Sequence, residues 1–283
     1  MYKIIDGKSL AAEIKENLKT DIAAFNERFK REVVLAVILV GNNPASEVYV
    51  RNKIKAAEFV GIKSLSFSLP ENADENEVIK LIKTLSDDKK VDGILVQLPL
   101  PKHLNEDKIL SLIPPEKDVD GFTAVNVGNS VLFKHAVVSC TPLGIMYMLK
   151  SIPVTLCGKH AVVIGRSNIV GKPVSMLLLK ESCTVTICHS KTENLKEIAK
   201  QADILVVAIG KPNFVTADMV KDGAVVIDVG INRTGKGLCG DVDFEAVKDK
   251  ASYISPVPGG VGPMTIAMLM KNAYQCALRR ENA

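Results

Sequence analysis

The sequence predicts an α/β protein built from two domains, and three observations indicate this fold class. Short runs rich in β-branched residues alternate with amphipathic stretches along nearly all 283 residues, a pattern typical of parallel βαβ units. The length suits one large or two medium domains, and we favour two. Hydrophobic residues form 47% and charged residues 24% of the chain, which provides apolar surface for substantial cores and excludes a disordered chain.

The first half contains the elements of one α/β domain. Asn43 is suited to an N-cap and Pro44 to the first helical position, so a helix is expected to begin there. The apolar run before these residues is expected to be a buried strand. The expected elements are helix Ser9–Lys30, strand Val33–Val40, helix Pro44–Val60, strand Lys63–Leu69, helix Asp74–Ser86, strand Gly93–Leu98 and helix Asn105–Leu112.

The second half continues the alternation and predicts a doubly wound parallel sheet. The expected elements are a helix ending at Lys150, strand His160–Ile164, helix Val170–Glu181, strand Thr184–Cys188, helix Glu193–Ala199, strand Ile204–Ala208, helix Ala217–Lys221, strand Ala224–Val229 and helix Pro263–Arg279. We therefore expect one domain from residues 1–138, completed by the C-terminal helix 263–283, and a second from residues 139–262. A cleft is expected between them.

Composition and charge exclude several classes of function. The 36 basic and 32 acidic residues give a net charge of +4 and are scattered, so we do not expect nucleic acid as a partner. No apolar run approaches the length of a membrane span, and the N-terminus does not resemble a secretory signal. The six cysteines form no C-x-x-C pair, so we expect no metal site and interpret them as reduced thiols of a cytoplasmic protein.

A glycine turn follows the expected strand His160–Ile164. Gly165 and Gly171 are placed for a tight turn and for close helix packing, while Ser167 stands where a Rossmann fingerprint has its second glycine. Backbone N–H groups at the start of the next helix would face a pyrophosphate. The variant pattern predicts a Rossmann-like dinucleotide site, although an ordinary βα turn is the alternative.

The residues after the next strand favour NADP over NAD. A site for NAD usually has an acidic residue here to bind the ribose hydroxyls, whereas this chain has Cys188-His189-Ser190-Lys191. Arg166 and Ser190, with Lys191 as a further candidate, could surround a 2′-phosphate. The alternative is a simple polar turn after the strand.

Three polar groups in the first half are candidates for proton chemistry. Tyr49 and Lys53 lie four residues apart, on one face of the expected helix. A desolvated lysine can exchange protons, although an ordinary amphipathic surface helix also explains this spacing. Gln97 interrupts an apolar strand at its carboxyl end, where ligands bind in parallel sheets. Its amide could hold a catalytic group or a substrate carbonyl, or cap the backbone.

Two further segments are candidates for ligand binding. Asp118 and Asp120 could bind an amino-substituted heterocycle, although Asp120-Gly121 is also a common turn dipeptide. The segment Pro258-Gly259-Gly260-Val261-Gly262-Pro263 would let backbone approach a ligand closely. A turn that starts a helix is the alternative.

Taken together, the motifs resemble one family in order along essentially the whole chain. They are Gly41-Asn42-Asn43-Pro44-Ala45-Ser46, Tyr49 with Lys53, Val96-Gln97-Leu98-Pro99-Leu100-Pro101, Asp118-Val119-Asp120-Gly121, Gly165-Arg166-Ser167 and Pro258-Gly259-Gly260-Val261-Gly262-Pro263-Met264-Thr265. The sequence is similar to bifunctional methylenetetrahydrofolate dehydrogenase/methenyltetrahydrofolate cyclohydrolases. It departs from them at Ser139, where the family has a proline before Cys140.

The resemblance implies a function for each domain. Residues 1–138 would bind folate and residues 139–262 NADP; the enzyme would oxidise 5,10-methylenetetrahydrofolate and hydrolyse the methenyl product to 10-formyltetrahydrofolate. By resemblance, Lys53 is the acid/base of hydrolysis, Gln97 orients it, Tyr49 stacks on the folate and Asp120 binds the pterin. The implied substrate-binding residues are Tyr49, Lys53, Val96, Gln97, Leu98, Asp120, Pro258, Gly259 and Gly260; those for the cofactor are Gly165, Arg166, Ser167, Ser190 and Ile231.

The family also implies a homodimer assembled through the nucleotide half and roles in purine, methionine and histidine supply. Three other functions remain open at the level of sequence. They are a dehydrogenase without cyclohydrolase activity, an NADP oxidoreductase with another substrate, and a non-catalytic NADP-binding module. The presence of both Lys53 and Gln97 argues against the first, and the ordered motifs of the first half argue against the second.

Overall fold

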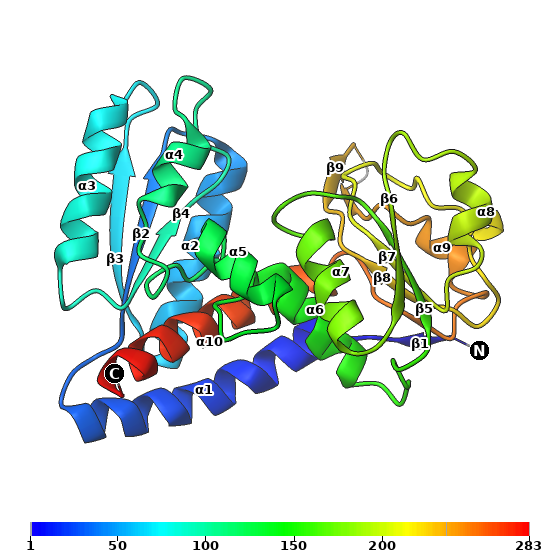
Figure 1. Ribbon diagram of the computed structural model, residues 1–283, viewed down its shortest axis with the longest axis horizontal. Coiled ribbons are helices and arrows are strands. Elements are labelled where there is room, and N and C mark those ends of the chain that lie inside the picture. Colours follow the sequence, from blue (N-terminus) through cyan, green and yellow to red (C-terminus); the bar gives the residue numbers. More distant parts are fainter. Residues whose placement is uncertain (1, 236, 283) are drawn as a thin grey trace. The chain divides into compact units, whose positions relative to one another are not determined.

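The computed structural model describes residues 2–235 and 237–282, which fold into two compact units (Figure 1). The six-stranded unit comprises Met1–Ala11 and Thr141–Thr265, and the three-stranded unit comprises Ala12–Cys140 and Ile266–Ala283. The expected α/β class with two domains is confirmed. Within the described ranges, no helix combines the length and apolar character needed to cross a membrane.

The six-stranded unit is built on a fully parallel sheet. Its strand order is β1-β11-β8-β7-β5-β6. The strands are β1 (Lys3–Ile4), β5 (His160–Ile164), β6 (Thr184–Cys188), β7 (Ile204–Val207), β8 (Val225–Asp228) and β11 (Tyr253–Ile254). After β5, the chain adds β6 on one side of β5, and it then adds β7 and β8 on the other side. The strand order therefore reverses between β5 and β7, and ligands bind at such a point in doubly wound sheets.

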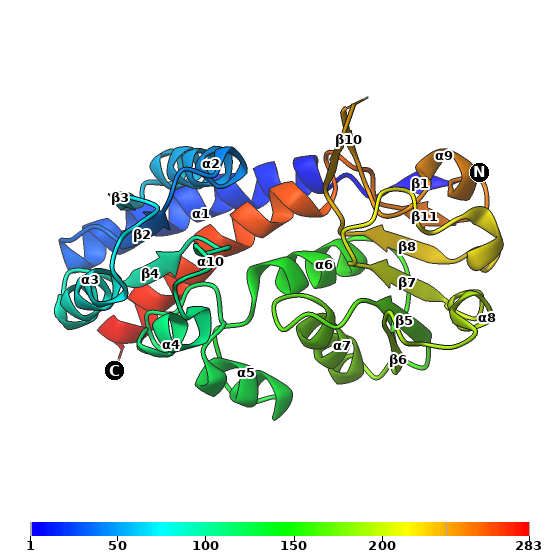
Figure 2. The same cartoon turned by 90° about the horizontal axis from the view of Figure 1, so that it is seen from above.

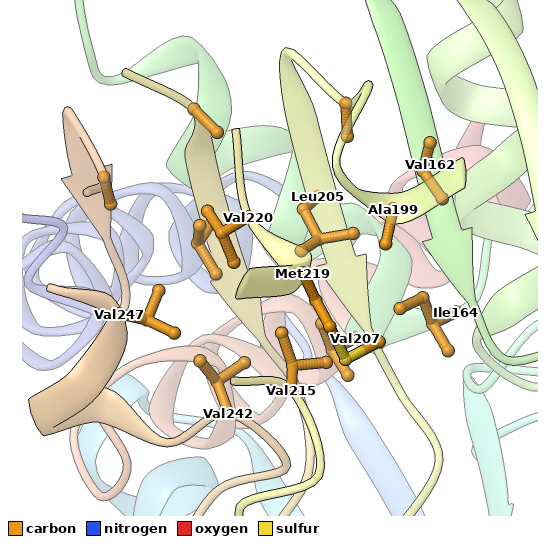
Figure 3. Close-up of a cluster of buried hydrophobic side chains, with 14 of the residues drawn as sticks. Val162, Ile164, Ala199, Leu205, Val207, Val215, Met219, Val220, Val242 and Val247 are labelled. Atoms are coloured by element: carbon orange, nitrogen blue, oxygen red, sulfur yellow. The ribbon is translucent and has the colours of Figure 1, made fainter. Parts of the chain in front are cut away.

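Helices cover both faces of this sheet (Figure 2). They are α6 (Cys140–Lys150) and α7 (Gly171–Lys180) on one face, with α8 (Leu195–Ala199), the 3-10 helix η1 (Ala217–Met219) and α9 (Phe244–Val247) on the other. A core of aliphatic side chains lies beneath the second group and includes Val162, Ile164, Leu205 and Val207 (Figure 3). An antiparallel hairpin of β9 (Asn232–Thr234) and β10 (Gly237–Cys239) extends from the unit.

The three-stranded unit is a second parallel sheet, with strand order β3-β2-β4. Its elements are β2 (Val34–Val40), α2 (Pro44–Val60), β3 (Lys63–Leu69), α3 (Glu75–Asp87), β4 (Gly93–Val96), α4 (Glu106–Ser111) and α5 (Ala124–Val131). Helix α2 packs on one face of the sheet, and α3 and α4 cover the other face (Figure 2). Every residue of β2 and β4 is buried, as expected for parallel strands covered on both faces.

Local signals at its two ends explain why α2 has the predicted bounds. The Asn43 side chain accepts hydrogen bonds from the backbone N–H groups of Ala45 and Ser46, and Pro44 follows at the first helical position. Gly61 ends the helix with φ of 85°, in the left-handed region that glycine adopts most readily. The helix therefore starts and stops where the sequence predicts.

The structure differs from several expected boundaries. The first eleven residues belong to the six-stranded unit because β1 pairs with β11, whereas the sequence placed them with residues 12–138. The segment 217–221 forms only the short 3-10 helix η1, and β4 ends at Val96. The final helix, α10 (Val261–Glu281), begins two residues earlier than predicted, and α1 (Gly7–Phe29) likewise starts earlier.

Asp92, which directly precedes β4, joins distant parts of the three-stranded unit. It is completely buried, and its Oδ2 accepts hydrogen bonds from Arg31 Nη1 at 2.8 Å and from the Val34 backbone N–H at 2.9 Å. Its Oδ1 accepts from Arg31 Nη2 at 3.0 Å and from Arg280 Nη1 at 2.8 Å. The carboxylate therefore binds the segment that follows α1, the start of β2 and the end of α10.

Replacing Asp92 with alanine is expected to lower the free energy of unfolding by about 3 kcal/mol or more, because two guanidinium groups lose their buried partner. Urea denaturation followed by circular dichroism measures the change. Glu32→Ala is the matched control, since the Glu32–Lys63 ion pair is exposed and should contribute less than about 1 kcal/mol. Equal effects of the two substitutions would contradict this role for Asp92.

Candidate functional site

Lys53 and Gln97 form a buried hydrogen-bonded pair in the three-stranded unit. Each is 9% exposed, and Lys53 Nζ donates to Gln97 Oε1 at 3.0 Å. The Gln97 backbone N–H donates to the carbonyl oxygen of Ile38 at 2.9 Å, and its Nε2 donates to the carbonyl oxygen of Leu98 at 2.6 Å. Because both ends of the amide are occupied, its oxygen is held toward the lysine amine.

Asp120 adds a carboxyl group to this pair. Desolvation by burial raises its pKa, while the positive charge of Lys53 opposes that shift. Cys140 Sγ lies 3.8 Å from Asp120 Oδ1 as a donor. Burial raises the pKa of the Cys140 thiol well above its usual value, so this sulfur stays protonated and neutral near pH 7. The amine, amide and carboxyl groups thus form one cluster of interacting polar groups.

A second aspartate builds the turn that carries Asp120. The buried Asp118 carboxylate accepts hydrogen bonds from the backbone N–H groups of Phe122 and Thr123, at 3.2 and 2.8 Å. From α10, Asn272 Nδ2 donates to the carbonyl oxygen of Val119 at 2.9 Å. Asp118 therefore serves the turn itself, whereas the carboxyl group of Asp120 contacts Cys140 and interacts electrostatically with Lys53.

Tyr49 lies one helical turn before Lys53 but is 39% exposed. Partial burial raises the pKa of its phenol, so the hydroxyl remains protonated at neutral pH. Of the other predicted substrate-binding residues in this unit, Val96 is buried at the end of β4 and Leu98 is partly exposed beside Gln97. Tyr49 thus offers an accessible aromatic face next to the buried pair.

A cavity opens at the carboxyl edge of the same sheet. It has a volume of about 570 Å³ and is lined by residues 40–43, Glu71 and residues 99–103. This volume lies within the range of small-molecule sites. Pro99 in its wall follows Gln97 by two positions, but the residues that line the cavity do not include Tyr49, Lys53, Gln97 or Asp120.

The glycine turn after β5 has a geometry that side chains would block. Gly165 has φ of 130°, and a Cβ there would overlap the carbonyl oxygen of Ala208 at the end of β7. A Cβ at Gly171 would overlap the carbonyl oxygen of Gly165. Ser167 Oγ accepts hydrogen bonds from the backbone N–H groups of Val170 and Gly171, at 3.1 and 3.3 Å. The turn therefore allows the close backbone approach that a pyrophosphate needs, while the N–H groups of Val170 and Gly171 at the start of α7 are bonded to Ser167.

Arg166 and Ser190 follow the carboxyl ends of neighbouring strands. β5 pairs with β6, and the Gly165 backbone N–H donates to the carbonyl oxygen of Cys188 at 2.9 Å. Both Arg166 and Ser190 are exposed, and no acidic residue occurs between Cys188 and Lys191. A cation and a hydroxyl at this edge fit the 2′-phosphate of NADP.

Ile231 and the turn Pro258–Gly260 also belong to the six-stranded unit. Ile231 is 43% exposed, and its Cδ1 lies 3.4 Å from the position that a Cβ would take at Gly262. Gly259 has φ of 103°, and its carbonyl oxygen accepts a hydrogen bond from the Lys8 backbone N–H at 2.8 Å. Ile231 therefore lies against the glycine-rich segment. They lie in the six-stranded unit, whereas Lys53 and Gln97 lie in the three-stranded unit.

Two buried aspartates that the sequence analysis did not single out organise the six-stranded unit. Asp228, at the end of β8, accepts hydrogen bonds from the backbone N–H groups of Asp241 and Val242 at 2.9 and 3.0 Å. Asp241 is completely buried and binds the loop after β7. Desolvation raises the pKa of Asp228 to about 7, despite the opposing effect of its N–H donors. An acidic residue at the end of Val225-Val226-Ile227 is the signal that could have identified Asp228.

Comparison with known proteins finds family models and relatives that match nearly the whole chain. The family model described as "Tetrahydrofolate dehydrogenase/cyclohydrolase, catalytic domain" matches residues 5–120, and the one described as "Tetrahydrofolate dehydrogenase/cyclohydrolase, NAD(P)-binding domain" matches residues 139–281. The "Bifunctional protein FolD" of Agathobacter rectalis is 57% identical over 280 residues, covering 99% of this chain and 100% of the relative.

Two solved structures extend the similarity to the fold. The bifunctional FolD enzyme of Campylobacter jejuni is 52% identical with a TM-score of 0.97, covering 99% of this chain and 100% of that one. The methylenetetrahydrofolate dehydrogenase-cyclohydrolase of Trypanosoma brucei, complexed with NADP and an inhibitor, is 38% identical with a TM-score of 0.96 and covers 100% of this chain and 99% of that one.

Asp228 is expected to make stability depend on pH between about 4 and 7. Its folded pKa is raised to about 7 from an unfolded value near ~3.9, so the folded state holds a proton that the unfolded state has lost. The stabilisation by this proton is complete below about pH 4 and is lost as the pH rises through about 7.

The comparison of wild type with Asp228→Asn isolates this effect, since the variant cannot titrate at residue 228. The difference in unfolding free energy, wild type minus variant, should fall by about 1.4 kcal/mol per pH unit between pH 5 and 6.5 and level off above 7.5. Urea denaturation at each pH measures it. A difference that stays constant from pH 5 to 8 would rule out the raised pKa.

Proposed function

Because the chain belongs to the tetrahydrofolate dehydrogenase/cyclohydrolase family, as its motifs predict, we propose that it catalyses two consecutive reactions. It oxidises 5,10-methylenetetrahydrofolate to the 5,10-methenyl form with NADP, and it hydrolyses that product to 10-formyltetrahydrofolate. The hydrogen bond between Lys53 Nζ and Gln97 Oε1 is the observation that carries the assignment of a cyclohydrolase activity beside the dehydrogenase activity. It supports an oriented proton-exchanging group, which hydrolysis needs and hydride transfer does not.

The dehydrogenase step requires positioning more than proton transfer. NADP, when bound, accepts the hydride that leaves the one-carbon bridge of the substrate. The nitrogen lone pairs of the substrate already stabilise the cation that develops. In this proposal the Gly165 turn and the start of α7 bind the pyrophosphate, and Arg166 and Ser190 bind the 2′-phosphate. Holding both reactants in near-attack geometry contributes several kcal/mol.

The cyclohydrolase step requires protons to move. Water forms a bond to the methenyl carbon and loses a proton, after which the bond from that carbon to N5 breaks and N5 gains a proton. Lys53 is the acid/base that relays this proton, and Gln97 keeps the amine oriented toward the substrate. Asp120 accepts hydrogen bonds from the amino and ring N–H groups of the pterin, and the exposed ring of Tyr49 stacks on the folate.

We further propose that the protein works in the cytoplasm as a homodimer assembled through its nucleotide-binding unit, and supplies one-carbon groups for purine, methionine and histidine synthesis. The six free cysteines are consistent with a reducing compartment.

One assay tests the two activities: 5,10-methylenetetrahydrofolate and NADP are added, and the appearance of NADPH and the conversion of methenyl to formyl product are followed separately. Failure of both reactions in folded protein would refute the proposal.

Replacing Lys53 with methionine should reduce the cyclohydrolase kcat by about 10² to 10⁴-fold, because the general acid/base is lost. The dehydrogenase activity should retain a larger fraction of its wild-type rate. Lys55→Met is the matched control: it removes an exposed amine two positions later on the same helix. Hydrolysis of methenyltetrahydrofolate at the wild-type enzymatic rate by the Lys53 variant would disprove the assigned role.

Replacing Arg166 with alanine should lower kcat/KM for NADP by about tenfold or more, because one charge-assisted hydrogen bond to the 2′-phosphate is lost. The value for NAD should change little. Steady-state kinetics with both cofactors gives the ratio, and Lys180→Ala, an exposed cation at the end of α7, serves as the charge control. An equal loss for NADP and NAD would show that Arg166 does not read the 2′-phosphate.

A further inference from the structure

The Asp241 carboxylate is a point where two separate segments of the six-stranded unit are joined. It is completely buried. Its Oδ2 accepts hydrogen bonds from the backbone N–H groups of Ile209 and Gly210 at 2.7 and 2.9 Å. Its Oδ1 accepts from the Lys211 backbone N–H at 2.8 Å and from Asn232 Nδ2 at 2.9 Å. Four donors therefore converge on one side chain.

The two joined segments lie where the fold places a dinucleotide. Residues 209–211 follow Ala208, the first residue after β7. The carbonyl oxygen of Ala208 lies so close to Gly165 that a Cβ there would overlap it, at the point where the strand order reverses. Asn232 follows Ile231, one of the proposed cofactor-binding residues. Asp241 thus fixes a segment at the glycine turn together with the residue next to Ile231.

The backbone at Asp241 is itself held in place by hydrogen bonds to Asp228. The Asp228 carboxylate accepts the backbone N–H groups of Asp241 and Val242, and the Asp228 backbone N–H donates to Ser255 Oγ at 2.8 Å. Gly230 and Gly240 provide the space, because a Cβ at either position would overlap the carboxylate of Asp241 or Asp228, respectively. The carboxylate of Asp241 is therefore rigidly placed.

We propose that Asp241 is a positioning residue for NADP, which holds residues 209–211 and 231–232 in the arrangement that the dinucleotide requires. This inference rests on the proposed function. A carboxylate has lone pairs for four donors, whereas an asparagine would turn its NH₂ group toward two of the N–H donors and leave them unsatisfied. Residue 241 could then no longer bind both Asn232 and the loop that follows β7.

The experiment compares Asp241→Asn with Asp243→Asn in the full-length protein. Asp243 lies two positions away and caps α9 through the Ala246 backbone N–H, a role in which asparagine is equally good. The dissociation constant for NADP is measured by calorimetry, and dehydrogenase and cyclohydrolase kinetics are measured on the same samples. We expect Asp241→Asn to raise Kd and KM for NADP by about tenfold or more, as for the loss of a hydrogen bond to a charged group. The control should bind NADP as the wild type does.

The cyclohydrolase activity, assayed with methenyltetrahydrofolate and no NADP, separates positioning from general damage. It should remain within about twofold of wild type in Asp241→Asn, because the Lys53 cluster lies in the three-stranded unit. A parallel loss of both activities in folded protein would mean that Asp241 has a purely structural role, and the proposal would fail. Unchanged NADP affinity in a folded Asp241→Asn variant would overturn it directly.

Asn232→Ala is the milder second variant, which decides the question if Asp241→Asn does not fold. It removes one of the four donors and leaves the carboxylate in place, so we expect Kd for NADP to rise by about threefold to tenfold with cyclohydrolase activity retained. Unchanged affinity here would refute the inference. A wild-type protein that neither binds nor reduces NADP would instead overturn the proposed function, and this inference with it.

Discussion

Burial of whole strands is the constraint on which the rest of this structure depends. Every residue of β2, β4, β7 and β8 is buried, so these four strands have no room for polar side chains along most of their length. Ionisable groups are confined to strand ends and to the segments that follow them. Gln97 follows β4, Arg166 follows the glycine turn after β5, and Asp228 ends β8. The same apolar burial that stabilises each sheet therefore concentrates the chemistry at its carboxyl edge.

The protein stabilises its buried carboxylates in two different ways. Asp92 is paired with two guanidinium groups, whereas Asp228 and Asp241 are surrounded by N–H groups from backbone and amide. Guanidinium groups reach a carboxylate from segments far apart in the chain and join those segments. Backbone N–H groups are short-range donors, so a carboxylate that they surround fixes the conformation of a loop. The first solution joins the segment after α1 to α10, and the second holds loops of the six-stranded unit.

Local signals explain which parts of the fold the sequence predicts. Helix α2 has its expected bounds because a cap, a proline and a left-handed glycine are adjacent to its ends. The two-residue strands β1 and β11 escaped prediction because Lys3 gains its partner, Tyr253, only through the tertiary fold. The short helix α5 was likewise missed. The α/β class and most longer elements follow from periodicity, while short pairings depend on contacts that no window of sequence contains.

In the candidate site, too, the sequence predicts single residues from local signals but not the contacts between residues far apart in the chain. Sequence reasoning placed Lys53 on a helix face and Gln97 at a strand end, but the hydrogen bond between them closes a separation of 44 residues, and their joint role came from the family resemblance. Asp241 was missed because its donors lie 30 to 32 positions earlier or 9 positions earlier in the chain, and an aspartate after glycine looks like an ordinary turn. Polar networks of this kind become visible only with coordinates.

The close approach of Gly230 to Asp241 and of Gly240 to Asp228 links four positions into two interlocked pairs. A larger residue at either glycine would displace a carboxylate that already accepts hydrogen bonds from backbone N–H groups. Removal of a carboxylate would leave an unfilled space beside a glycine. Single substitutions at these four positions are therefore each unfavourable even where a coordinated change would be tolerated.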